Sequence, residues 1–365
     1  MELITLLKSQ NIPLRKSDKY MLGTCPFDAY HKETLVVDPV NNTYHCVSCG
    51  AHGNADTFRR QLQNKMCVHT SSTQGDHSMV SVLKKIYEIA AAFYAGQLDG
   101  CDEAADYIYS SRKLTEDTVI KFQLGYSPRG SLLYKYLSEN YCFSDDTLLL
   151  TGLFKKSDSG QLYDAFRHRL MFPIKNEYNE IVAFGGRVLD DSSPKYINSP
   201  ETLIFKKSNT LYGFHRAKHS DNDSFIICEG YMDVISMHQA GFTNAVASLG
   251  TALTREQCNL MMKSKSKAYV IYDMDAPGRK AAIRAIQMME QTGIHTSSVY
   301  LHPAKDPDEF LKRFGNDKFI DRLKSAKDGK LSSVRDMFIA YDESAARSRA
   351  VDQIFQLPAE KRYLF

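Results

Sequence analysis

Short apolar runs and helical segments alternate along the second half of the chain. The apolar runs lie at 225–228, 245–248, 268–272 and 297–301, and the helical segments lie at 232–240, 254–264 and 278–292. Parallel strands must be joined by crossover segments, which are usually helical, so this order predicts a parallel sheet built from βαβ units. We therefore predict an α/β subdomain over residues 224–315.

The rest of the chain has weaker patterns, which divide it into four further stretches. Residues 81–223 begin with apolar positions at helical spacing, such as Ile86, Ile89 and Phe93, and become strand-like later, which predicts an α+β subdomain. The other stretches are 1–66, with metal-type cysteine spacing, 67–80, a Ser/Thr/Gly/His-rich segment expected to be a flexible linker, and 316–365, expected to be a polar helical cap. The predicted fold class is multi-domain, α+β and α/β.

Composition narrows the class of protein without identifying a ligand. The 365 residues are 43% hydrophobic and 24% charged, which is ordinary for a globular protein. The sequence has no apolar run of about 18 residues and no signal-peptide pattern, so we expect no membrane partner and a cytoplasmic protein with reduced cysteines. A net charge of +3 does not by itself indicate nucleic acid, so that argument depends on local basic segments.

Three cysteines near the N-terminus have the spacing of a zinc ribbon. Cys46 and Cys49 form a Cys-x-x-Cys knuckle, and Cys25 lies upstream, where it can face the knuckle from a neighbouring turn. The fourth ligand is His31, which is the more usual zinc partner, or Asp28, and His45 and His52 are further candidates. We predict a structural zinc site; the alternative is a set of unrelated free cysteines.

The segment between these cysteines predicts a hairpin. Residues 34–46 have the pattern of a strand, a turn and a strand. A ribbon of this kind is more often an interaction module than an enzyme. We expect it to bind single-stranded nucleic acid through a strand-face aromatic residue, Tyr44, and through basic residues such as Lys32, Arg59 and Arg60.

A basic segment with interspersed aromatic residues and glycines covers residues 155–218. Arg167 and Arg169 alternate, so on a strand they would point to the same face. Gly185 and Gly186 would allow the backbone to approach a phosphate closely. These features favour polyanion binding, and the alternative is an ordinary solvated surface.

Carboxylates follow two of the predicted strands. Glu229 follows the run 225–228, and Asp273 and Asp275 follow the run 268–272, so both groups should lie at the carboxyl edge of the sheet. Asp306 and Asp308 form a third group. Several carboxylates in one place repel one another unless cations are present, and hard oxygen ligands suit Mg²⁺ or Mn²⁺. The acids therefore predict a divalent-metal phosphoryl-transfer site.

In these motifs the chain resembles the bacterial (DnaG-type) DNA primases, including their Toprim domain. Cys25-Pro26-Phe27 with Cys46-x-x-Cys49-Gly50 is similar to the primase zinc-binding domain. The strings at 122–128, 167–174, 184–189 and 195–202 are similar to the primase polymerase core and are not general Toprim features. The resemblance covers nearly the whole chain.

The resemblance implies an activity and a set of site residues. It implies a DNA-directed RNA polymerase, a nucleotidyltransferase that makes short RNA primers from NTPs on a single-stranded DNA template, with Mg²⁺ or Mn²⁺ for catalysis and structural Zn²⁺. The implied catalytic and metal-binding acids are Glu229, Asp273, Asp275, Asp306 and Asp308. The implied nucleotide- or nucleic-acid-binding residues are Arg167, Arg169, Arg187, Lys195 and Lys207.

Two features depart from the family pattern. Asp28 stands where the family usually has His, so the zinc set is Cys25, Cys46 and Cys49 with His31 or Asp28. The chain ends about where the family's polymerase core ends, so the helicase-binding domain is expected to be absent and the replicative helicase is only a possible partner. We expect the protein to work at the nucleoid or replication fork. Two alternatives stay open: a Toprim nuclease, and a non-catalytic zinc-ribbon accessory protein that binds single-stranded DNA.

Overall fold

A computed structural model describes residues 3–9, 12–17, 19–26, 34–47, 51–63, 75–141, 143–273 and 275–328. The chain forms two units, and it passes between them more than once. The first unit contains Met1–Gln97, Gly125–Leu170 and Thr202–Ile204, and the second contains Leu98–Leu124, Met171–Glu201 and Phe205–Phe365. Each unit is described by itself.

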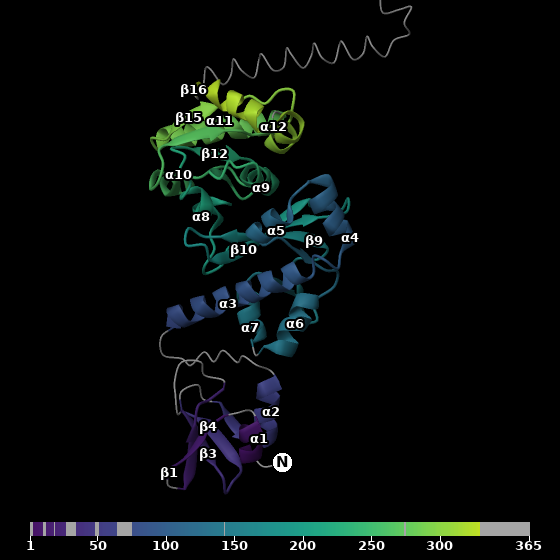
Figure 1. Ribbon diagram of the computed structural model, residues 1–365, viewed down its shortest axis with the longest axis vertical. Coiled ribbons are helices and arrows are strands. Elements are labelled where there is room, and N and C mark those ends of the chain that lie inside the picture. The colour runs from purple at the N-terminus through teal and green to yellow at the C-terminus, as the bar shows by residue number, and fades with distance from the viewer. Residues whose placement is uncertain are drawn as a thin grey trace, which may run out of the picture. The chain divides into compact units, whose positions relative to one another are not determined.

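The N-terminal part of the first unit is an antiparallel sheet in the order β1-β2-β3-β4-β5 (Figure 1). The strands are β1 (Leu14–Ser17), β2 (Tyr20–Gly23), β3 (Leu35–Asp38), β4 (Thr43–Cys46) and β5 (His52–Asn54), and the helices are α1 (Leu3–Ser9) and α2 (Ala55–Gln63). The predicted hairpin is confirmed as β3 and β4. Alternate side chains of both strands enter a core with Leu3, Leu7 and Phe58.

The expected nucleic-acid contact of Tyr44 is wrong. Tyr44 is 3% exposed, and its ring packs edge-on against Phe58 with 4.8 Å between centroids. In β4 the buried positions are Tyr44 and Cys46, while Thr43 and His45 face outward. Strand alternation therefore assigns the aromatic ring to the core, since neighbouring residues point to opposite faces.

The remainder of the first unit is built around the long helix α3 (Gly75–Gly96), shown in blue in Figure 1. Its other elements are β6 (Gly125–Ser127), α6 (Leu132–Asn140), α7 (Asp145–Leu150), β7 (Phe154–Lys156) and β8 (Leu162–Asp164). Because α3 begins at Gly75, residues 75–80 are helical rather than part of the expected linker; residues 67–74 lie outside the described residues. Gly125 lies against α3 so closely that a Cβ would come within 2.5 Å of the Tyr94 backbone.

The second unit begins with a short helical segment and continues with part of a mixed subdomain. The elements are α4 (Asp102–Ala105), a π-helix η1 (Asp106–Ser111), α5 (Glu116–Phe122), β9 (Arg169–Lys175), β10 (Ile181–Val188), β11 (Tyr196–Asn198), a 3₁₀ turn η2 (Lys207–Asn209) and α8 (Phe214–Ala217). β9 starts at the end of the first unit's residues. β10 pairs with β11 in antiparallel register, with Gly185 opposite Asn198. The strand-like patterns predicted in residues 81–223 are therefore confirmed.

The predicted parallel sheet is confirmed in the rest of the second unit (green in Figure 1). Its order is β13-β12-β14-β15-β16, with the first four strands parallel. The strands are β12 (Phe225–Cys228), β13 (Ala245–Ala247), β14 (Lys267–Val270), β15 (His295–Ser298) and β16 (Lys327–Asp328), and the helices are α9 (Tyr231–Gln239), α10 (Arg255–Met262), α11 (Ala276–Gln291) and α12 (Pro307–Lys324). β12 is buried along its whole length, as expected for a strand of a covered parallel sheet.

Two details differ from the predicted pattern. The last parallel strand is β15, His295–Ser298, and only its tail overlaps the predicted run 297–301. α12 also crosses the predicted boundary at residue 316, with a kink at Gly315, where φ is 77°. Most of the predicted cap, residues 329–365, lies outside the described residues. None of the helices in the described ranges is long and apolar enough to cross a membrane.

Candidate functional site

Glu229 and Asp273 meet at the carboxyl edge of the parallel sheet. Glu229 directly follows β12, and Asp273 lies three residues beyond the end of β14. The two strands are parallel neighbours with Ile227 opposite Val270, so their ends lie side by side. The backbone N–H of Asp273 donates a hydrogen bond to Glu229 Oε2 at 3.3 Å. The sequence-based placement of these two acids is therefore realised in space.

Two more acids complete this side of a pocket. Asp306 is the N-cap of α12, and its carboxylate accepts from the Glu309 N–H at 2.7 Å. Asp233, in the first turn of α9, accepts from the Gly230 N–H at 3.1 Å. With Glu229 and Asp273, these side chains line a cavity of about 340 Å³. We call these four residues the pocket acids.

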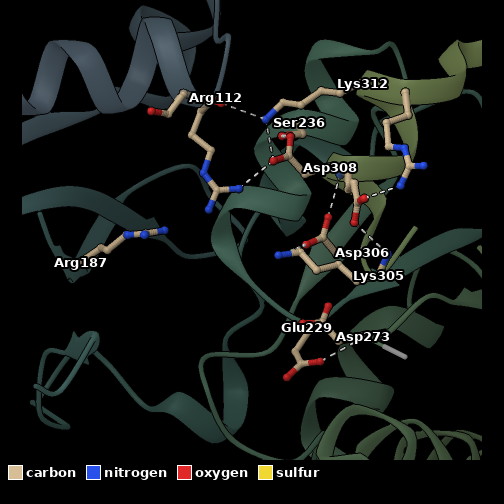
Figure 2. A network of polar contacts seen from close by, with 12 residues as sticks. Arg112, Arg187, Glu229, Ser236, Asp273, Lys305, Asp306, Asp308 and Lys312 are labelled. Atoms are coloured by element: carbon tan, nitrogen blue, oxygen red, sulfur yellow. Dashed lines mark hydrogen bonds and ion pairs between the residues drawn. The ribbon is translucent and has the colours of Figure 1, made fainter. Parts of the chain in front are cut away.

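Basic residues line the same cavity. Arg187 comes from β10, Arg112 follows the π-helix, and Lys195 and Lys305 come from loops. We call these four residues the pocket bases. Figure 2 shows Arg187 on the opposite side of the space from Glu229 and Asp306, with the Lys305 side chain beside the acids. The cavity therefore presents both signs of charge to whatever enters it.

Glu229, Asp233 and Asp273 have raised pKa values. Burial, followed by repulsion from Glu229, Asp306 and Asp275, raises the pKa of Asp273 to about 7. Burial and the charges of Asp273 and Asp306 raise the pKa of Asp233 well above its ordinary value. Burial also raises the pKa of Glu229. A bound cation would relieve both the desolvation and the repulsion, so the acids favour one.

The pocket bases are crowded in the same way. The pKa of Lys195 is lowered first by the charge of Arg187, then by burial and by Arg112 and Lys305, and Asp273 only partly offsets this. An anion beside Lys195 would relieve this repulsion. The pocket therefore suits a ligand that carries both charges, such as a polyphosphate with a divalent cation.

The donor set of the pocket acids fits a hard divalent cation, because all four donors are carboxylates. In the described part of the chain, no three His, Cys, Asp or Glu side chains are arranged closely enough to hold one ion together. The carboxylates would therefore have to turn toward an ion that they share. The fit rests on the ligand chemistry and on the raised pKa values.

Asp275 and Asp308, which the resemblance implied as metal ligands, are not among the residues that line this pocket. Asp275 is exposed and caps α11, accepting from the Gly278 N–H at 2.7 Å. Asp308 is 4% exposed and is held by Arg112, Lys312 and Ser236, each at 2.7 Å (Figure 2). The structure thus gives Asp308 three close partners, whereas the pocket acid Asp306 has Lys305 Nζ at 3.8 Å.

Some of the predicted basic residues line the pocket and others do not. Arg187 and Lys195 line the pocket. Lys207 lies in η2, where its carbonyl accepts from Gln257 Nε2 at 2.9 Å, and it does not line this pocket. The expected alternation of Arg167 and Arg169 on one strand face is wrong. His168, with φ at 52°, interrupts the extended chain before β9, so Arg167 is exposed while Arg169 is only 8% exposed.

Glycine is required at position 185 for a reason other than the predicted approach of the backbone to a phosphate. A Cβ there would lie 2.7 Å from the Tyr231 ring. The Tyr231 hydroxyl donates to Asn198 Oδ1 at 2.6 Å, and Asn198 Nδ2 donates to the Leu249 carbonyl at 2.8 Å. The absence of a side chain at Gly185 therefore allows the Tyr231 ring to pack against the paired strands β10 and β11, where Tyr231 and Asn198 line the pocket.

Sequence reasoning missed three residues of the pocket. Asp233 stands in the first turn of a helix, a common place for an acid, and its burial beside Asp273 was not visible in the sequence. Lys305 directly precedes Asp306, so its position beside a candidate acid was an available signal. Arg112 gave no signal, because it stands in a polar segment far from the acids in the sequence.

The two described cysteines of the predicted zinc site lie at one end of the N-terminal sheet. Cys46 ends β4, and Cys25 follows β2 by two residues. Gly23 lies opposite Leu35, and Leu35 lies opposite Cys46, so the register places both cysteines at the same end. Both are buried, which suits thiolate ligands of a structural zinc site. The other expected ligands, Cys49 and His31 or Asp28, lie outside the described residues.

Three family models match successive parts of the chain. A CHC2 zinc finger matches residues 1–86, the N-terminal domain of the DNA primase catalytic core matches 93–218, and a Toprim-like domain matches 226–311. These matches support zinc binding and divalent-metal binding in general terms.

Curated relatives and solved structures give the same result. The DNA primase of Clostridium acetobutylicum is 33% identical over 336 residues, which are 87% of this chain and 56% of the relative. The chain thus spans little more than half the length of this relative. A crystal structure of the zinc-binding and RNA polymerase domains of the Aquifex aeolicus primase matches with a TM-score of 0.65 and 30% identity, covering 90% of this chain and 83% of that one. A DnaG primase catalytic domain bound to ssDNA matches with a TM-score of 0.63 and 29% identity, covering 78% and 94%.

Proposed function

Because this chain belongs to the bacterial DNA primase family, we propose that it synthesises short RNA primers from NTPs on a single-stranded DNA template. The observation that carries the proposal is the pocket in which acids and bases face one space. A nucleoside triphosphate with its divalent cation has the matching charges. The family membership supplies the reaction class, and the pocket supplies a place for it.

In the proposed reaction, the 3′-hydroxyl of one nucleotide attacks the α-phosphate of the next. A P–O bond forms while the bond from the α-phosphorus to the oxygen of the β-phosphate breaks, pyrophosphate leaves, and the hydroxyl proton passes to solvent. Arg187 and Arg112 would orient the triphosphate, since a guanidinium can hold two phosphate oxygens at once. Lys195 and Lys305 would add charge where negative charge develops on the leaving group. Most of the catalytic effect would then come from positioning and electrostatics.

Glu229, Asp233, Asp273 and Asp306 are the residues that would hold the cations, which we propose are Mg²⁺ or Mn²⁺. When bound, such ions neutralise phosphate charge and lower the pKa of a coordinated hydroxyl. The raised pKa of Asp273 means that protons compete with the cation near neutral pH. Cation affinity should therefore increase as the pH rises through about 7.

The proposed template is single-stranded DNA. A related catalytic domain is described as bound to ssDNA, which supports the same class of template here. We propose that the N-terminal ribbon, residues 1–66, assists template binding and that Arg167, Arg169 and Lys207 contribute phosphate contacts. Asp275 remains a predicted contributor to the metal site, whereas Asp308 is held by Arg112, Lys312 and Ser236.

A primer-synthesis assay tests the proposal directly. The full chain is incubated with single-stranded DNA, labelled NTPs and Mg²⁺ or Mn²⁺, and short RNA products are expected. Asp273→Asn should lower the rate by roughly 10²–10³-fold, the range found when one group that stabilises transition-state charge is removed. The proposal fails if the wild-type chain makes no RNA or if the variant is as active as wild type. DNA cleavage without NTPs would instead favour the nuclease alternative.

A further inference from the structure

One phenol oxygen is shared by two guanidinium groups at the pocket. Arg112 Nε donates to Tyr107 Oη at 2.7 Å, and Arg187 Nη1 donates to the same oxygen. Both cations also lie over the Tyr107 ring, at 4.2 Å for Arg187 and 5.2 Å for Arg112. Like charges normally separate, so Tyr107 stabilises an arrangement that the two arginines would not adopt alone.

The π-helix places Tyr107 and Arg112 together. The Arg112 N–H donates to the Tyr107 carbonyl at 2.9 Å, an i to i−5 bond that defines this helix type. In an α-helix, residues five apart point about 140° away from each other, because one turn contains only about 3.6 residues. The wider turn stacks the two side chains on one face. A π-helix at this position is therefore a local device that brings Arg112 to Tyr107.

Asp308 fixes Arg112 from the other side. Its Oδ2 accepts from Arg112 Nη1 and from Lys312 Nζ, and its Oδ1 accepts from Ser236 Oγ. Protein donors thus contact both oxygens of this carboxylate, which is 4% exposed, so Asp308 is poorly placed to bind a metal ion.

Arg187 still has donors to offer. The hydrogen bonds of Arg187 use Nη1, which reaches Tyr107 and Tyr196, while its Nε is buried with no hydrogen-bond partner in the described part of the chain. Nε and Nη2 form one edge of a guanidinium, and this edge matches two oxygens of a phosphate group. A buried donor without a partner costs free energy, and a small rotation of the Arg187 guanidinium toward a phosphate in the pocket would remove that cost.

We propose that Tyr107 and Asp308 are positioning residues that hold Arg112 and Arg187 as one receptor for the triphosphate of the incoming nucleotide. The inference rests on the proposed function and adds two residues to it. In this assignment Asp308 acts through Arg112 and does not bind the metal ion. Tyr107 acts through both arginines without reaching the reacting atoms.

Binding of inorganic tripolyphosphate to the full chain tests the receptor without requiring RNA synthesis. Titration calorimetry should show binding to the wild-type chain. Tyr107→Phe removes only the shared oxygen and should weaken that binding by about tenfold, as expected for loss of a hydrogen bond to a charged group. Tyr109→Phe is the matched control, since Tyr109 lies in the same π-helix and is 39% exposed. It should bind like wild type.

The outcomes separate the two proposals. If the wild-type chain does not bind tripolyphosphate, or if Tyr107→Phe binds it as tightly as wild type, the receptor is overturned. If tripolyphosphate binds as expected but no primer is made, the receptor stands and the proposed function fails. Thermal melting of both Tyr variants identifies any loss that comes from unfolding.

A second measurement distinguishes positioning from metal binding at Asp308. Mn²⁺ binding is followed by electron paramagnetic resonance on Asp308→Asn and, for comparison, on Asp273→Asn. We expect Asp308→Asn to weaken tripolyphosphate binding while Mn²⁺ affinity is kept, and Asp273→Asn to weaken Mn²⁺ binding. Equal loss of Mn²⁺ in both variants would overturn the role assigned to Asp308.

Discussion

The pocket acids and Asp308 lie in the same unit but have opposite electrostatic character. Burial raises the pKa of Asp273 and Glu229, and neighbouring carboxylates raise it further. Burial acts on Asp308 in the same direction, yet three hydrogen bonds lower its pKa. Burial therefore does not decide the charge state of a carboxylate; its partners do. The mutual repulsion of the pocket acids favours binding of a cation. Asp308, in contrast, is bonded to Arg112, Lys312 and Ser236 and connects the segments that carry them.

The largest expected effect on stability comes from removing the ion pairs of Asp308 with Arg112 and Lys312. Asp308→Asn removes a charge while Arg112 and Lys312 stay behind, and we expect unfolding to become easier by about 2–3 kcal/mol. Removal of one partner of a fully buried pair costs about 3–5 kcal/mol, and the partners here are partly exposed. Urea denaturation measures the change. A variant as stable as wild type would show that these ion pairs contribute nothing to the free energy of unfolding.

An intermediate effect should appear in the dependence of stability on pH. Between about pH 4 and 7 folded Asp273 keeps a proton that the unfolded chain loses, so its contribution makes stability fall as the pH rises. Asp308 has a lowered pKa, so its contribution is present above about pH 4 and is lost only on further acidification.

Urea midpoints of wild type and Asp273→Asn, without added divalent ions, measure this slope. We expect the difference in unfolding free energy between the two proteins to change on the order of 1 kcal/mol from about pH 5 to about pH 7. Added Mn²⁺ should stabilise wild type most at the higher pH, since it replaces the proton. If the difference in unfolding free energy between the two proteins does not depend on pH, repulsion among the pocket acids does not affect stability.

The smallest effect is expected one residue away from Asp308. Glu309 pairs with Arg313 at 2.7 Å on the exposed side of α12, with side chains 31% and 50% exposed. Glu309→Gln should cost only about 0.3–0.5 kcal/mol, the usual value for an exposed pair four residues apart on a helix. The comparison of Glu309→Gln with Asp308→Asn shows how much burial adds to the effect of losing an ion pair. A loss as large as that of Asp308→Asn would contradict the comparison.

The elements that position the pocket were largely predictable from the sequence. β12 and α9–α11 follow the predicted segments closely, because strongly apolar runs and helical spacing record burial on one face or both. β15 was misplaced because His295–Ser298 is polar and alternates, while the apolar run beyond it attracted the prediction. Tyr44 was assigned to the surface for a related reason, since its face depends on the register of β4.

The sequence by itself determined that carboxylates follow β12 and β14, and parallel strands oblige such residues to meet at one edge. Only the tertiary structure decided which acids face the pocket and which partners they find. Asp306 and Asp308 stand two residues apart, yet one lines the pocket and the other is bonded to Arg112, which is 196 residues away in the chain. Local pattern fixes the direction of a strand or helix, but charge pairing depends on distances between segments that only the folded chain brings together.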